Sequence, residues 1–190
     1  MEFVKDKEMY FMVQDTPFNR KYHNYKLGDI CDCSKKHNAK YVNYKKAKHK
    51  LFKTPKEKRT VFMESLHEKV RKSINPELPS RLSSIILYDN LEDCYELAKK
   101  WNKNAGRTPL GLFKVKCEGK LHACATTPDE QKSNELKKEA HIAEITRFWQ
   151  GDKTAKTQEY FFQGKAEIIE ILKYYNWQLG VCLSYTSVLA

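Results

Sequence analysis

The residue in this sequence best placed to do chemistry is a carboxylate at the edge of a predicted strand. Glu159 follows a polar, glycine-containing loop over residues 151–157 and precedes the aromatic run Tyr160-Phe161-Phe162. A side chain at such a strand end can meet a substrate from the loop side while the strand holds it in place. The alternative is an ordinary solvated glutamate, and spacing alone does not choose between the two.

Positive charge is concentrated in one stretch of the chain. The formal net charge is +11, and residues 34–59 carry eleven lysines or arginines against one acid, a net charge of +10. Tyr41, Tyr44 and Phe52 are interleaved with these cations, which suits phosphate contacts combined with base stacking. An acidic protein partner would explain the same charge, as would a solvated lysine-rich excursion whose aromatic residues pack on the core. The candidate nucleic-acid contacts are Lys35, Lys36, Lys40, Lys45, Lys46, Lys48 and Lys50.

The composition is that of one globular domain. Of the 190 residues, 41% are apolar and 12% aromatic, which argues against disorder and predicts a single domain over 1–190. No apolar run approaches the length of a membrane helix, and the first residues lack a signal-peptide core. We therefore expect a cytoplasmic protein without a membrane partner, whose apolar tail at 174–190 packs as a last strand or two.

The six cysteines are expected to be reduced and mostly buried. Cys31 and Cys33, followed by His37, are the one hint of metal-ligand spacing. Because no second ligand pair lies nearby in the sequence, no metal site is predicted.

The order of predicted elements indicates an α+β fold, because strands and helices do not alternate regularly. We expect five to seven strands and three helices, and we find neither a P-loop nor a dinucleotide-binding fingerprint. The predicted helices cover 55–74, 91–101 and 127–149. The first should bury Phe62, Leu66, Val70 and Ile74, the second should begin after an N-cap at Asn90, and the third should bury Phe148. The predicted strands cover 9–14, 84–88, a hairpin of 112–117 and 120–126 around Glu118-Gly119, and two short strands within 157–172 separated at Gly164-Lys165.

Three segments together resemble ADP-ribosyltransferase-like domains of the small bacterial and phage kind. They are a first strand containing Tyr10-Phe11-Met12-Val13 with a Leu27-Gly28-Asp29 turn, the run 78–85 before the helix at 91–101, and Arg147-Phe148-Trp149-Gln150-Gly151 followed by Glu159 to Ala166. The resemblance covers the order of elements over most of residues 9–172 but not the basic excursion at 34–59. It implies a split β-sheet that forms a cleft for NAD, with a catalytic glutamate at a strand edge.

The resemblance assigns roles to particular residues. Glu159 would hold the 2′-hydroxyl of the nicotinamide ribose and stabilise positive charge on the sugar as the glycosidic bond breaks. Arg81 would be a second catalytic group that grips the pyrophosphate, unless it caps backbone carbonyls instead. The other predicted NAD-binding residues are Tyr10, Met12, Gln14, Ser83, Ser84 and Tyr88, of which Tyr88 could equally belong to the core.

The sequence departs from the family pattern on the first strand. Such domains usually carry a His or Arg there, whereas this chain has Phe11 and Met12. Either Arg81 takes the polar role, or Arg20 or His23 does, or the site is inactive.

These features predict an NAD-dependent ADP-ribosyltransferase that modifies nucleic acid. Single-stranded RNA or DNA is favoured as acceptor, because an unpaired base is easier to present to an active site than a stacked one. The resemblance further implies a toxin or phage-defence effector with an antitoxin protein as partner. One alternative is a non-catalytic nucleic-acid-binding module that uses residues 34–59. The other is a metal-dependent nuclease using Asp89, Glu167 or Glu170.

Overall fold

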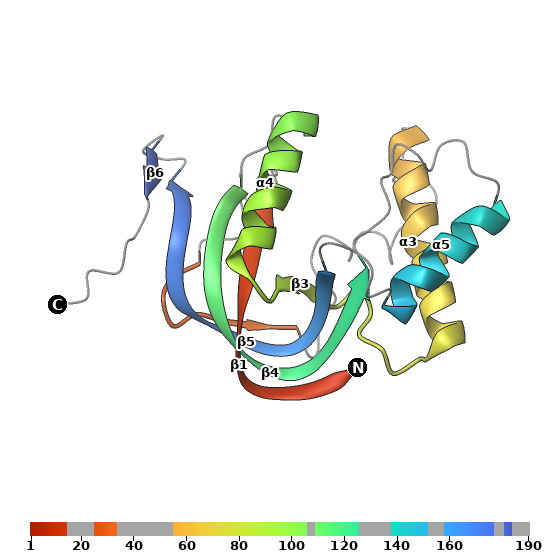
Figure 1. Ribbon diagram of the computed structural model, residues 1–190, viewed down its shortest axis with the longest axis horizontal. Helices are drawn as coiled ribbons and strands as arrows, with labels where there is room; N and C mark the ends of the chain where they lie inside the picture. Colours follow the sequence, from red (N-terminus) through yellow and green to blue (C-terminus); the bar gives the residue numbers. More distant parts are fainter. Residues whose placement is uncertain are drawn as a thin grey trace. The chain divides into compact units, whose positions relative to one another are not determined.

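A computed structural model describes residues 1–14, 25–33, 55–105, 109–125, 138–151, 158–176 and 181–183. In these residues the protein is α+β, with three helices and six strands. The helices are α3 (Pro55–Ile74), α4 (Leu91–Ala105) and α5 (Lys138–Gln150); the strands are β1 (Glu2–Gln14), β2 (Ile30–Asp32), β3 (Ile85–Tyr88), β4 (Pro109–Ala125), β5 (Gln158–Asn176) and β6 (Val181–Leu183) (Figure 1).

The strands form one hydrogen-bonded sheet in the order β2-β5-β3-β1-β4, with β6 beside β5 and a further pairing between β5 and β4. β1 and β3 are antiparallel, with Tyr10 opposite Tyr88 and Phe11 opposite Leu87. β2 runs antiparallel to β5, with Cys31 opposite Ala166. The predicted α+β class is confirmed. The finer prediction of a split, ADP-ribosyltransferase-like sheet stays a prediction.

The chain forms two compact units, each assembled from three separate stretches of sequence. Unit 1 contains residues 1–3, 33–85 and 120–163, and unit 2 contains residues 4–32, 86–119 and 164–190. Helices α3 and α5 belong to unit 1, where they lie against each other (Figure 1). Helix α4 belongs to unit 2, while β1, β4 and β5 each contribute residues to both units.

The core of unit 1 forms where α3 meets α5. Leu66 and Val70 are buried on α3, and Phe148 and Trp149 are almost completely buried on α5. The predicted apolar face of α3 also contained Phe62 and Ile74, but their side chains are 53% and 37% exposed. That part of the prediction is wrong because polar residues occupy the rest of the inward face, namely Glu64, His67 and Arg71.

Gly151 ends α5 in a backbone conformation that favours glycine. Its φ is +71°, its N–H donates to the carbonyl of Phe148 at 3.2 Å, and a Cβ would lie 2.8 Å from the carbonyl oxygen of Ala123. The same helix end brings the carbonyl oxygen of Trp149 to within 2.9 Å of His122 Nε2. A glycine is therefore needed where the helix closes on β4.

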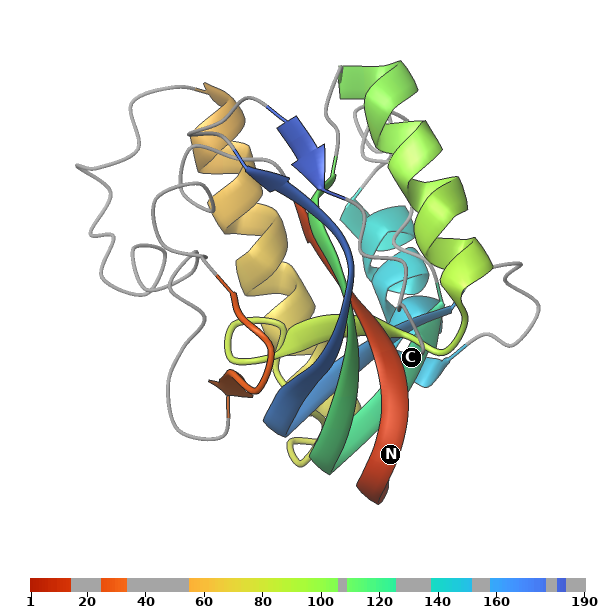
Figure 2. The same ribbon diagram turned by 90° about the vertical axis from the view of Figure 1, so that its left-hand side faces the viewer.

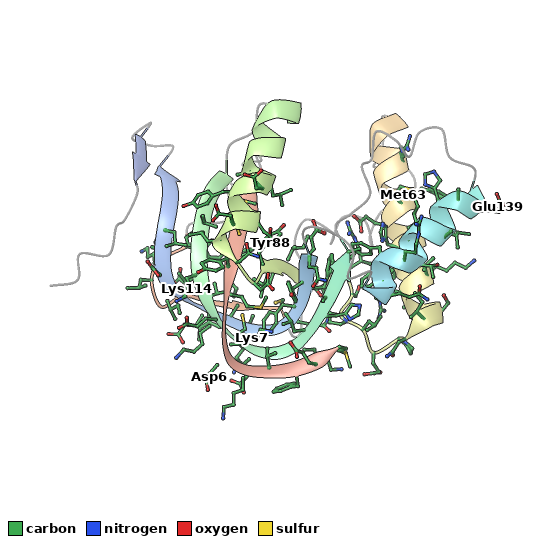
Figure 3. All side chains as sticks on the ribbon, viewed as in Figure 1. Asp6, Lys7, Met63, Tyr88, Lys114 and Glu139 are labelled. Atoms are coloured by element: carbon green, nitrogen blue, oxygen red, sulfur yellow. The ribbon has the colours of Figure 1, made fainter. Side chains whose placement is uncertain are left out.

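The core of unit 2 forms between α4 and the central strands (Figure 2). Its buried members are Met12, Tyr88, Cys94 and Leu112, with partly buried side chains of α4 packed against them; Figure 3 labels Tyr88 in this cluster. The predicted N-cap of α4 is confirmed, because Asn90 Oδ1 accepts a hydrogen bond from the backbone N–H of Asp93 at 2.8 Å.

The two predicted strand breaks at glycine are wrong. β4 runs unbroken from Pro109 to Ala125, and β5 runs unbroken from Gln158 to Asn176. Glycine serves inside strands as well as in turns, and Gly119 has a φ of +155°, which other residues avoid. Both glycines lie where their strand passes from one unit to the other.

Across the described ranges, no helix is both long enough and apolar enough to cross a lipid bilayer. The same ranges contain no group of three or more His, Cys, Asp or Glu side chains that could hold a metal ion. Cys31, Cys33, Cys94, Cys117 and Cys124 are free thiols. His37, the third member of the weighed metal motif, lies outside the described residues.

Candidate functional site

Glu159, the central residue of the sequence prediction, lies near the start of β5 in unit 1. Its side chain is only 7% exposed, so it is not a solvated strand-end glutamate. A carboxylate so withdrawn from water persists when neighbouring groups stabilise it, because burying an uncompensated charge is costly. The surroundings of Glu159 therefore decide what it can do.

Arg81 lies in the same unit and is held by a carboxylate from α3. Its Nε and Nη2 atoms donate to the two carboxylate oxygens of Glu64, each at 3.0 Å. The two side chains are 12% and 11% exposed. This fork-to-fork pairing fixes the orientation of the guanidinium as well as its position.

Two phenylalanine rings also lie close to the guanidinium group of Arg81. The guanidinium carbon lies 5.6 Å from the ring centre of Phe148 and 5.4 Å from that of Phe161. Both distances are within the range of cation–π attraction. Phe161 is two residues beyond Glu159 on β5, so the strand that carries the carboxylate also contacts the arginine.

The segment that carries Arg81 is tied to α3 by a second buried arginine. Arg71 Nη1 donates to the carbonyl oxygens of Pro76 and Leu78 at 2.7 and 2.6 Å, and Arg71 also forks onto Glu68. Glu68 Oε2 in turn accepts a hydrogen bond from Ser80 Oγ at 2.8 Å. Burial alone would raise the pKa of Glu68, but the hydrogen bonds from Arg71 and Ser80, with nearby positive charge, hold its pKa below the usual value.

Ser83 links this segment directly to β5. Gln163 Nε2 donates to Ser83 Oγ at 2.7 Å. Ser84, the next predicted site residue, is 2% exposed. Glu159, Arg81, Ser83 and Ser84 therefore all belong to unit 1, and the two segments that carry them are joined by direct contacts.

The charges at this site shift the pKa values of two buried groups, Cys124 and His67. Burial raises the pKa of the Cys124 thiol well above its usual range; the charge of Glu159 raises it further and that of Arg81 opposes this. Burial also lowers the pKa of His67 to about 2, with Arg81 acting in the same direction. Glu159 and Arg81 thus affect the pKa of the same buried thiol with opposite sign.

The remaining predicted NAD contacts belong to unit 2. Tyr10, Met12 and Tyr88 are members of the apolar cluster beside α4, and Gln14 ends β1. Met12 and Tyr88 are 6% and 3% exposed. The core alternative weighed for Tyr88 fits this burial, and the contacts of these residues with NAD stay predictions.

The predicted nucleic-acid contacts, Lys35 to Lys50, lie outside the described residues, as do Arg20 and His23. Of the basic excursion, residues 55–59 are described and form the first turn of α3. The alternative nuclease residues Asp89, Glu167 and Glu170 belong to unit 2, and they are not part of any metal-binding group within the described chain.

The model of a protein family matches residues 1–174, which is most of the chain. The chain belongs to this family, whose description is "protein of unknown function (DUF2441)". The match includes all of unit 1 and the apolar cluster of unit 2. A search of curated proteins found no match to the chain.

Sequence reasoning missed Glu64, Phe148 and Gln163 as parts of this site. Glu64 is 17 residues from Arg81, and a glutamate in a helix rich in charged residues gives no sign that it faces inward. Phe148 was expected in the core, which is where it lies, but its contact with Arg81 depends on how α5 packs. No spacing in the sequence could have revealed these partners.

Proposed function

We propose that the protein transfers ADP-ribose from NAD to a nucleic acid, with Glu159 as the catalytic carboxylate. The observation that carries the proposal is a buried acid on β5 whose unit also holds a rigidly oriented Arg81. The charges of Glu159 and Arg81 both affect the pKa of the Cys124 thiol, in opposite directions. The resemblance to ADP-ribosyltransferase-like domains supplies the reaction.

The reaction needs a carboxylate at this place. As the bond between nicotinamide and ribose breaks, the sugar carbon becomes positively charged, and a nearby carboxylate stabilises that charge. Nicotinamide leaves with the electrons of the broken bond, the acceptor atom bonds to that carbon, and the acceptor's proton passes to Glu159. A carboxylate shielded from water acts more strongly on such a charge than one in solvent, because the surroundings screen it less.

Arg81 fits a positioning role in this scheme. Two of its nitrogen atoms bind Glu64 and its guanidinium carbon lies near the adjacent rings of Phe148 and Phe161, so the cation is fixed before any substrate arrives. Such a fixed cation can orient Glu159 or the pyrophosphate without reorganising. Ser83, held by Gln163, would place a hydroxyl group in the same part of the unit.

The acceptor in this proposal is single-stranded RNA or DNA, attracted by the +10 charge of residues 34–59. An enzyme that modifies nucleic acid inside a cell would act as a toxin or phage-defence effector. Its inhibition would then require an antitoxin protein, and we propose the cytoplasm as its location.

Transfer of labelled ADP-ribose tests the proposal. The protein is incubated with NAD labelled in the adenylate part, together with RNA, single-stranded DNA or cell lysate. Glu159→Gln should lower the transfer about 10²- to 10³-fold, as expected when one transition-state-stabilising group is lost. Glu118→Gln, which changes an exposed acid of β4 in the same way, should transfer label like the wild type.

Two results would decide against the enzyme. One is a wild-type protein that transfers no more label than Glu159→Gln. The other is equal loss in Glu159→Gln and Glu118→Gln. Thermal unfolding of each variant shows whether a loss of transfer reflects a loss of folding.

A second candidate function is nucleic-acid binding without chemistry. The concentration of charge in residues 34–59 favours it, because binding needs that stretch alone. It predicts an affinity whose logarithm falls linearly with the logarithm of salt concentration and that neither NAD nor Glu159→Gln changes.

A further inference from the structure

The outer face of α3 carries an exposed ring and exposed lysines in a single row. The exposed side chains on this row are Phe62, Ser65, Lys69, Lys72 and Ser73. At about 100° per residue these positions fall within an arc of roughly 100° around the helix. Phe62 is 53% exposed, an unusual position for a large ring on a helix whose other face packs against α5.

The acids of α3 do not neutralise this row. Among the side chains described on this helix, the acids are Glu64 and Glu68, and both are directed to partners inside unit 1. Glu64 binds Arg81, and Glu68 binds Arg71 and Ser80. Lys72 Nζ lies 3.7 Å from Glu68 Oε1, yet its side chain remains 62% exposed.

The row also continues the basic excursion along the chain. Residues 55–59, the end of the +10 stretch, form the first turn of α3, and the exposed row begins within the next turn. Figure 1 shows α3 as one uninterrupted helix over its whole length. The last cations of the excursion, Lys56, Lys58 and Arg59, therefore lie on the same helix as Lys69 and Lys72.

We propose that this row, defined by Phe62, Lys69 and Lys72, is a binding surface for single-stranded nucleic acid. Lys69 and Lys72 would contact phosphates, and Phe62 would stack on an unpaired base. The proposal rests on the proposed function for its acceptor class and extends that function to a surface on α3. In this proposal α3 binds the acceptor strand, whereas the bond between nicotinamide and ribose breaks at Glu159.

The exposed ring distinguishes nucleic acid from an acidic protein as the partner. Lysines alone attract either polyanion, because both carry a high density of negative charge. A solvent-exposed phenylalanine on the same row adds a stacking surface that an unpaired base fills and a glutamate chain does not. The row is also too narrow and too polar to form a hydrophobic protein interface.

Binding of a fluorescein-labelled oligo(U) strand, followed by fluorescence anisotropy over a series of salt concentrations, tests the surface. Phe62→Ala should weaken binding about fivefold to a hundredfold, while Phe62→Tyr, which keeps the ring, should bind like the wild type. The double variant Lys69→Gln/Lys72→Gln should lower the slope of log affinity against log salt by about 1.4, since each lost phosphate contact removes about 0.7.

The matched control removes the same charge elsewhere. Lys116→Gln/Lys165→Gln changes two exposed lysines of β4 and β5. It should weaken binding of oligo(U) only by the small amount that follows from a net charge lower by two. Unlabelled poly-L-glutamate serves as the competing polyanion. It should displace oligo(U) weakly, and Phe62→Ala should not change that displacement.

The outcomes separate this surface from the enzyme. Glu159→Gln should bind oligo(U) normally and lose transfer. A wild-type protein that binds oligo(U) but transfers no more label than Glu159→Gln would overturn the enzyme and leave the surface intact. Wild-type affinity in the α3 variants, or no binding of oligo(U) by the wild type, would overturn the surface. Equal effects of both lysine pairs would overturn it too. Strong displacement of oligo(U) by poly-L-glutamate, combined with an affinity for oligo(U) that Phe62→Ala does not change, would identify the row as a surface for an acidic protein.

Discussion

The interiors of the two units differ in kind. Unit 1 buries charged and polar side chains, including Glu64, His67, Arg71 and Glu159, beside its aromatic rings. The cluster of unit 2 around Met12 and Tyr88 is assembled from apolar and aromatic side chains with one thiol. Buried charged and polar groups stabilise a fold poorly compared with apolar residues, so a unit that retains them is the better candidate for chemistry.

This difference bears on the predicted site. The acid, the arginine and the serines fall in the polar interior, whereas Met12 and Tyr88 fall in the apolar one. These residues were predicted to form one NAD site because the segments that carry them follow one another as in one family. The structure instead pairs Arg81 with the carboxylate of Glu64 and packs Met12 and Tyr88 among apolar side chains.

Removing one member of the buried ion pair should produce the largest change in stability. Arg81→Leu leaves Glu64 buried without its fork partner, and we expect the free energy of unfolding to fall by about 3–5 kcal/mol. Urea denaturation followed by circular dichroism measures it. The double variant Glu64→Leu/Arg81→Leu should regain most of the loss. If the single variant is as stable as the wild type, the pair is not buried as described.

A cavity in unit 2 should lower the free energy of unfolding by as much as Arg81→Leu does, or by less. Met12→Ala removes a 6%-exposed side chain from the apolar cluster and should cost about 2–5 kcal/mol in the free energy of unfolding. Met12→Leu keeps the volume and should cost less than about 1.5 kcal/mol. If Met12→Leu instead impairs NAD binding at unchanged stability, Met12 contacts NAD and the contrast between the two interiors is weakened.

A buried histidine of unit 1, His67, should make the stability of the fold depend on pH. The folded-state pKa of His67, about 2, lies below its unfolded value of 6.5, so the unfolded chain takes up a proton that the folded chain refuses. The resulting stability is complete above pH 6.5 and is lost as the pH falls towards 2, by about 1.4 kcal/mol per pH unit.

Replacing the histidine isolates its share of this acid sensitivity. His67→Phe keeps a ring against Phe148 and Trp149, and its unfolding free energy should fall less steeply with decreasing pH. Burial also lowers the pKa of His122, so part of the acid sensitivity should remain. Parallel pH profiles for the variant and the wild type, from urea titrations at several pH values, would contradict the assignment.

Several local features of the fold could be predicted from the sequence. The bounds of α3, the strand at Ile85–Tyr88 and the capping of α4 by Asn90 all follow from signals within a few residues, such as apolar periodicity, proline and a capping side chain. The predictions of strand breaks at Gly119 and Gly164 were wrong because they also relied on signals within a few residues. A glycine has the same local signature in a turn and in the middle of a long strand.

The amino-acid sequence by itself determined the α+β class, the position of the +10 charge and the presence of an acid at a strand edge. The tertiary structure alone decided that Glu159 is buried, that Arg81 pairs with Glu64, and that the predicted site residues divide between two units. Short-range patterns fix helices and strands because backbone geometry repeats over a few residues. The partner of a buried charge depends on which distant segments pack together, and no local period encodes that choice.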